Sequence, residues 1–205
     1  MRTLLLAIVS LISSIGFAQE CLNVDYKIRG YFYAGTAQQD TISPGGFGGS
    51  SNTPKPLLQK LRSRSTADAL QIVVTDEATS FAKNYKGMKV YVVNTTGSTI
   101  GLDAQDSRLE LKRQVFHKGQ WKDIEYLPSS WCGNSYHQVF IKSNQYWEFN
   151  APCLEGKMAA TFRFELSVNN EQIIYSNEFE GSFNKSQLKK EQGHTANNIM
   201  DPYNN

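Results

Sequence analysis

Apolar and polar residues alternate in several short segments, which is the pattern of strands that bury one face. Met158–Val168 shows it most clearly, because Phe162, Phe164, Leu166 and Val168 fall on one face and charged or hydroxyl residues on the other. The same period of two recurs in Leu70–Thr75, Met88–Val92 and Arg108–Phe116. No segment has a convincing amphipathic helical pattern. The chain is therefore predicted to be all-β.

Turn residues divide these segments into pairs. His117-Lys-Gly-Gln predicts a hairpin turn, after which Trp121–Leu127 returns. Ser143-Asn144 separates two stretches rich in aromatic and β-branched residues, Tyr136–Ile141 and Gln145–Phe149, and Gln172–Phe183 is the last expected strand. Together the segments predict a β-sandwich of about seven to nine antiparallel strands over residues 67–184.

The order of these features resembles bacterial immunoglobulin-like β-sandwich domains of exported proteins. The residues that carry the resemblance are VYVVNTTG, the strand ending in HKGQW, the pair VFIKSNQYWEF, and Gly156 followed by TFRFEL. The resemblance covers about residues 67–184. It implies a fold and an adhesive or scaffolding style of function, and it brings no shared active site.

Residues 1–18 have the form of a secretory signal peptide, with a basic start at Arg2, an apolar run and small residues at Gly16 and Ala18. We expect cleavage after Ala18 and an exported chain that is periplasmic, cell-surface or extracellular and keeps no transmembrane segment. A membrane anchor is the alternative, but the apolar run falls short of about 20 residues. Lipid attachment at Cys21 is disfavoured because Gln19 and Glu20 precede it.

The flanks of the expected domain are rich in small and polar residues. Residues 19–66 are interpreted as one N-terminal strand and a Gly/Ser/Pro-rich linker, and residues 185–205 as a disordered tail. Lys55–Arg64 is locally basic and is interpreted as a solvated linker end or a short helix leading into the domain, with an anion-binding arm as the alternative.

Composition and charge narrow the class of protein only slightly. The 205 residues are 40% hydrophobic, 20% charged and 12% aromatic, which suits a folded β-rich domain. Twenty-one basic and 19 acidic residues leave a net charge of +2, without the basic excess of a nucleic-acid-binding protein. We expect neither nucleic acid as a partner nor a cofactor.

The stretch Ser129–Cys153 holds two of the three cysteines. If Tyr136–Ile141 and Gln145–Phe149 pair about the Ser143-Asn144 turn, Cys132 and Cys153 lie one diagonal step from facing each other, so a disulfide between them is predicted. Cys21 would then be free or would form a disulfide dimer with a second chain.

Four kinds of chemistry are disfavoured by the residues and their spacing. Trp131-Cys132-Gly-Asn-Ser lacks the following helix that a thioredoxin-type cysteine needs. Cys132 with His137 lacks an assignable third group for nucleophilic catalysis, and with Cys153 it lacks the short spacing of a zinc site. Asp103, Asp106 and Glu110 lack the spacing of a calcium loop, so turn-forming Asp is the better interpretation. No metal and no catalytic residue are predicted.

A non-catalytic module that binds an unknown protein or glycan of the cell envelope is the leading functional hypothesis. The candidate recognition residues are Trp131, Tyr136, His137 and Trp147, with Leu127–Tyr136 as the recognition loop. One alternative is a small exported hydrolase or inhibitor domain that uses the loop around Trp131–His137. Another is an accessory structural domain of an envelope assembly.

Overall fold

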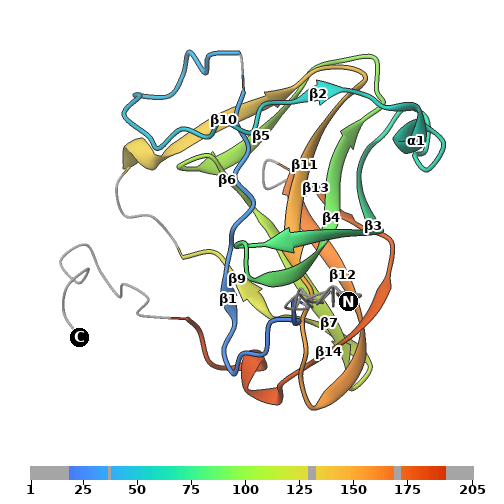
Figure 1. Ribbon diagram of the computed structural model, residues 1–205. Coiled ribbons are helices and arrows are strands. Elements are labelled where there is room, and N and C mark those ends of the chain that lie inside the picture. Colours follow the sequence, from blue (N-terminus) through green and yellow to red (C-terminus); the bar gives the residue numbers. More distant parts are fainter. Residues whose placement is uncertain (1–18, 37, 129–132, 169–171, 193–205) are drawn as a thin grey trace, which may run out of the picture.

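The computed structural model describes residues 19–36, 38–128, 133–168 and 172–192, and within them the chain is an all-β sandwich (Figure 1). The first sheet has the order β2 (Lys55–Pro56), β11 (Gln145–Pro152), β4 (Tyr85–Asn94) and β3 (Leu70–Phe81). The second has β13 (Gln172–Tyr175), β12 (Met158–Val168), β7 (Leu111–His117) and β8 (Gln120–Asp123), with β14 (Phe179–Phe183) also on β12. The third has β10 (Tyr136–Ile141), β5 (Ile100–Gln105) and β6 (Arg108–Leu109).

These three sheets are antiparallel, as predicted, but β1 (Ile28–Arg29) and β9 (Glu125–Tyr126) form a parallel pair. The sequence pattern located β10 and β12 with their observed bounds. The predicted turn after His117 joins β7 to β8, with positive φ at Lys118 and Gly119. The predicted strand Arg108–Phe116 is interrupted at Glu110, and β5 was not predicted at all. The described residues also form three short helices, α1 (Gln59–Arg62), η1 (Gly133–Ser135) and η2 (Lys185–Leu188).

The main hydrophobic core lies between the sheets, where the longer strands turn apolar side chains inward. It contains, among others, Val92 of β4, Leu102 of β5, Phe164 of β12 and Trp147 of β11, all with no exposed surface. A second cluster covers the outer face of the first sheet, where Leu61 of α1 packs on Tyr91 and other residues of β3, β4 and β11. The first sheet is thus covered on both faces at α1, which explains the continuous apolar run of β4.

The N-terminal residues belong to the same domain. Phe32 and Ala34 lie fully buried in the main core, and the indole Nε1–H of Trp147 donates to the Gly35 carbonyl (2.9 Å). The Gly/Ser/Pro-rich linker predicted within residues 19–66 is therefore part of the packed domain. Polar contacts, more than buried apolar surface, hold this segment in place. The Asn52 side chain, for example, donates to the carbonyls of Tyr33 and Glu148. The linker was predicted from the low apolar content of this segment, and apolar content carries no information about such hydrogen bonds.

The tail expected to be disordered from residue 185 is packed as far as residue 192. Gln187 of η2 is 1% exposed, and its side-chain oxygen accepts from the Asn184 N–H (2.9 Å). Lys27 N–H donates to the Lys190 carbonyl (2.5 Å), so this segment lies against the N-terminal part of the chain. Residues 193–205, and the signal-peptide prediction for residues 1–18, lie outside the described residues.

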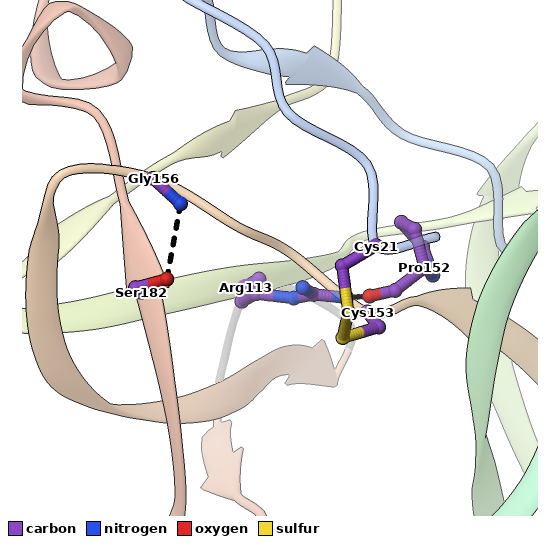
Figure 2. The surroundings of a disulfide bond; sticks show 6 residues. All are labelled: Cys21, Arg113, Pro152, Cys153, Gly156 and Ser182. Atoms are coloured by element: carbon purple, nitrogen blue, oxygen red, sulfur yellow. Dashed lines mark hydrogen bonds between the residues drawn. A yellow bond between two sulfur atoms is a disulfide. The ribbon is translucent and has the colours of Figure 1, made fainter. Parts of the chain in front are cut away.

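The disulfide differs from the prediction. Cys153 bonds to Cys21, 132 positions earlier, and not to Cys132 (Figure 2). The prediction failed because β10 and β11 do not pair: β10 pairs with β5, while β11 pairs with β4 and β2 in another sheet. Cys21 was predicted to be free or to form a disulfide dimer with a second chain; in the structure its sulfur is bonded within the chain. Cys132 lies outside the described residues.

A buried ion pair lies next to the disulfide. Arg113 of β7 and Glu125 of β9 are 1% and 0% exposed in their side chains, with 3.4 Å between Nε and Oε1. The Arg113 guanidinium also donates to the Pro152 carbonyl (2.8 Å), directly before Cys153, as Figure 2 shows. Tyr31 donates to Glu125 (2.7 Å). The pair thus connects β7, β9, the end of β11 and the N-terminal segment.

Candidate functional site

A pocket of about 650 Å³ opens at one end of the sandwich, where the third sheet meets an N-terminal segment. We call residues 38–50 the strap, because this segment crosses the end of the third sheet beside β5 and β10 (Figure 1). We call the cavity the strap pocket; its lining is Asp40, Ile42, Ser43, Pro44, Asp103, Ala104, Gln105, Arg108, Glu110, Leu127, Pro128, Gly133, Tyr136, His137 and Gln138.

Two aspartates fix the strap to the sheet. The Asp40 carboxylate accepts from the N–H groups of Gln138 (2.7 Å), Ile42 (2.9 Å) and Ser43 (3.3 Å). These backbone bonds, above all that from Gln138, lower the pKa of Asp40, so the group is charged near neutral pH. Asp106 accepts from the Gly48 N–H (2.9 Å) at the other end of the strap.

The His137 side chain of β10 lies between the strap and the third sheet. Its ring stacks on Phe47 of the strap with 3.6 Å between centroids, and its Nε2 accepts from the Ser107 N–H (2.8 Å). Burial lowers the pKa of His137, against the opposing charges of Asp40 and Asp106. An Nε2 that accepts a hydrogen bond is unprotonated, so the geometry and the direction of the pKa shift agree on a neutral ring.

Arg108 is the one cationic residue among those that line the strap pocket. Only 7% of the residue is exposed. One nitrogen, Nη2, donates to the Tyr33 hydroxyl (2.8 Å), and the guanidinium lies over the Tyr33 ring at 5.1 Å. Its Nε and Nη1 are buried and have no hydrogen-bond partner in the described part of the chain. Burying N–H donors of a charged group without hydrogen-bond partners costs free energy, so Arg108 stands out among the polar residues of this pocket.

The carboxylates that line the pocket differ in the hydrogen bonds that they accept. Asp40 holds three backbone N–H groups, whereas Asp103 accepts from the Gln138 side-chain amide (3.3 Å). Glu110, between β6 and β7, has no side-chain hydrogen bond or ion pair among the described residues, and its charge acts on Lys112. The pocket therefore presents both signs of charge.

The structure sorts the predicted recognition residues into three groups. Tyr136 (49% exposed) and His137 line the strap pocket. Trp147 is fully buried in the core, so its assignment as a recognition residue is wrong; its large aromatic surface fills the space between the sheets. Trp131 lies outside the described residues, as does Cys132.

The metal alternatives can be compared with the geometry. Within the described residues no group of three or more His, Cys, Asp or Glu side chains is arranged to hold a metal ion. Asp106 does form a turn: it and Ser107 have positive φ in the two-residue connection between β5 and β6. Asp103 instead lies within β5, contrary to its interpretation as a turn residue.

Sequence reasoning missed Arg108 and the strap. A signal for Arg108 was present, since Leu109 and Leu111 face the core and the alternation places Arg108 and Glu110 together on the opposite face. No comparable signal exists for the strap, because Asp40 and Phe47 reach the site only through contacts with residues about 60 to 100 positions away.

Comparison with protein-family models, with curated proteins and with solved structures gave no match to this chain. Among the helices in the described ranges, none has the length and apolar character needed to cross a membrane. The strap pocket is therefore the feature of this molecule that points to a function.

Proposed function

We propose that this protein is an exported, non-catalytic binding module that holds a small ligand, or a small group of a larger partner, in the strap pocket. The observation that carries the proposal is Arg108, a buried cation that lines a pocket of about 650 Å³ and has two donors without a partner among the described residues. That volume is in the usual range of small-molecule sites. The half-exposed Tyr136 ring adds a rigid apolar contact surface with a polar hydroxyl.

The bonding of the titratable groups supports binding rather than catalysis. A general base needs a free, basic atom within reach of the substrate. The His137 Nε2 is already used by the Ser107 N–H, and the Asp40 carboxylate by three backbone N–H groups. Both groups hold the strap in place. The hydrolase or inhibitor alternative, which depends on the region around His137, has no such support.

Export is supported by the sequence of residues 1–18 and by the disulfide. Disulfides persist in oxidising compartments, and Cys21–Cys153 would survive cleavage after Ala18. Cys21 would then be the third residue of the mature chain. Its bond would attach the new N-terminus to the end of β11.

The proposal is tested with residues 19–205, prepared with the disulfide formed and labelled for NMR. We expect members of a small-molecule fragment library to shift the amide signals of Tyr136, Gln138 and Arg108. Pro44→Trp places a large ring at the pocket lining and should weaken that binding at least tenfold. Ser51→Trp, just beyond the strap and outside the pocket lining, is the matched control and should leave it unchanged.

Failure of every fragment to shift these signals would refute the proposed site. Equal binding by wild type and Pro44→Trp would do the same, since the ligand would then occupy another surface.

A further inference from the structure

We propose that the strap is a pH-sensitive latch: neutral His137 holds it closed at Phe47 and Gly48, and uptake of a proton by the His137 ring releases that end, while the Asp40 end stays attached. The release follows from the contacts of the folded chain. It regulates the strap pocket, so its effect on a bound ligand rests on the proposed binding function.

Ser107, in the two-residue turn between β5 and β6, connects His137 to the strap. Its N–H donates to the His137 Nε2 (2.8 Å), and its hydroxyl donates to the Gly48 carbonyl (2.8 Å). Asp106, the other residue of the turn, accepts from the Gly48 N–H (2.9 Å). The turn and the imidazole therefore hold this end of the strap together, and Phe47 adds its stacking contact with the ring.

A proton on Nε2 turns this attraction into repulsion. The neutral imidazole has one nitrogen that accepts a hydrogen bond, whereas both nitrogens of the charged ring carry hydrogen. The charged His137 ring therefore points an N–H at the Ser107 N–H, and this donor, in a residue that is 2% exposed, loses its acceptor. The repulsion is relieved when the ring moves away from Phe47, or when the turn moves and lets go of Gly48. Both movements release the strap at the same end.

The charges around His137 set the pH of release. Burial lowers the pKa of its ring, while the carboxylates of Asp40 on the strap and Asp106 in the turn act in the opposite direction, as does the contact of Nδ1 with the Gln138 carbonyl. The remaining charged residues of the pocket lining are Asp103, Arg108 and Glu110. The ring is therefore neutral near pH 7 and takes up a proton below about pH 6.5, the ordinary value for histidine.

The Asp40 end of the strap is attached independently of this contact. Its carboxylate accepts the Gln138 N–H (2.7 Å), and backbone bonds, above all that one, lower its pKa. Asp40 therefore keeps its charge and its contact with β10 over the pH range in which the His137 ring titrates. Gly45 and Gly46, with φ of 78° and 82°, lie between this anchor and the released end, so the chain can bend there.

Opening of the latch removes one side of the strap pocket. Ile42, Ser43 and Pro44 line the pocket and lie between the Asp40 anchor and the released end. Movement of this end carries them away from β5 and β10. A ligand that is enclosed at neutral pH is then exposed to solvent, and it leaves more readily in an acidic environment.

Amide hydrogen exchange measures the latch without any ligand. Residues 19–205, with the disulfide formed, are followed by NMR between about pH 7.5 and about pH 4.5, and the exchange rates are corrected for the intrinsic effect of pH. We expect protection of the Gly48 and Ser107 N–H groups to fall about tenfold or more as the His137 ring signal titrates. Protection of the Gln138 N–H should stay constant, because its acceptor is Asp40.

Two histidine variants identify the group responsible. His137→Gln keeps an acceptor for the Ser107 N–H and takes up no proton in this range, so its Gly48 protection should not respond to pH. His117→Gln, which removes a histidine of β7, is the matched control and should respond as the wild type does. An uncharged fragment that binds in the pocket at neutral pH should bind the wild type about tenfold more weakly at the acidic end of the range, and His137→Gln equally at both.

The latch and the proposed function fail differently. The latch is wrong if Gly48 protection stays constant or rises while His137 titrates, if the ring stays neutral down to about pH 4.5, or if His137→Gln responds like the wild type. Simultaneous loss of protection at Gln138 would refute the anchor at Asp40. Constant fragment affinity with an open latch would refute its effect on the pocket. If no fragment binds at any pH, the proposed function is wrong, whereas a pH response of the strap in the same samples would still confirm the latch.

Discussion

Removal of the Cys21–Cys153 bond should cause a large loss of stability. The bond closes a loop of 132 positions. In the chain-entropy model a cross-link of this span raises the free energy of the unfolded chain by about 5 kcal/mol, because it removes conformational entropy. That is comparable with the whole free energy of unfolding of many domains. The folded chain keeps other connections at this place, because Leu22 N–H donates to the Cys153 carbonyl (2.8 Å) and Glu155 N–H to that of Leu22 (3.0 Å).

The assay is urea unfolding of residues 19–205 at a temperature where the variants still fold. We expect Cys21→Ser, Cys153→Ser and the double variant to lose the same free energy, because each removes one and the same bond. The denaturant dependence should steepen in all three, since an unfolded chain without the cross-link exposes more surface. Wild type treated with reductant should match them. Cys132→Ser is the control and should leave the disulfide and its contribution intact.

Peptide mapping without reduction decides the pairing independently. Recovery of a Cys132–Cys153 peptide would refute the argument, as would a stability loss in Cys132→Ser with none in Cys21→Ser. A loss well below about 5 kcal/mol with correct pairing would show that the unfolded chain stays compact without the bond.

Two further predictions follow from single side chains. Trp147→Phe removes the donor to the buried Gly35 carbonyl and leaves a space in the core. It should therefore lower the free energy of unfolding, measured by urea titration, by about 2–4 kcal/mol. Trp121→Phe, at a partly exposed residue of β8, is the control and should change that free energy by less than about 1 kcal/mol. Folding lowers the pKa of His137, so below about pH 6.5 the unfolded chain binds more protons at this residue than the folded chain does. The free energy of unfolding should therefore fall as the pH drops from about 7 to 5.5. His137→Gln keeps an acceptor for the Ser107 N–H and should flatten that pH dependence in thermal melts, whereas an unchanged profile would contradict the assignment.

Local pattern determined the class of fold and several of its strands. Alternation in Met158–Val168 predicted β12, and the aromatic and β-branched residues of Tyr136–Ile141 predicted β10, both with their observed bounds. Turn chemistry gave the β7–β8 connection, where Lys118 and Gly119 adopt positive φ. These features depend only on residues close together in the chain.

Strand partners were decided by tertiary structure. Ser143-Asn144 does turn the chain, but a turn between two strands of different sheets has the same local sequence as a hairpin turn. The disulfide prediction depended on that pairing and failed with it. The bond to Cys21 follows instead from the packing of residues 20–22 beside the end of β11, a contact between residues about 130 positions apart.

The candidate site was predicted only in part, because it is assembled from distant segments. Tyr136 and His137 were expected in one region because they are neighbours in the chain, and both line the strap pocket. Arg108 joins them through the pairing of β6 with β5 and of β5 with β10, and Asp40 joins them because the strap crosses the third sheet and accepts a hydrogen bond from the Gln138 N–H at the edge of β10. Alternation fixes which face of a strand a residue occupies, whereas the fold alone decides which other segment that face meets.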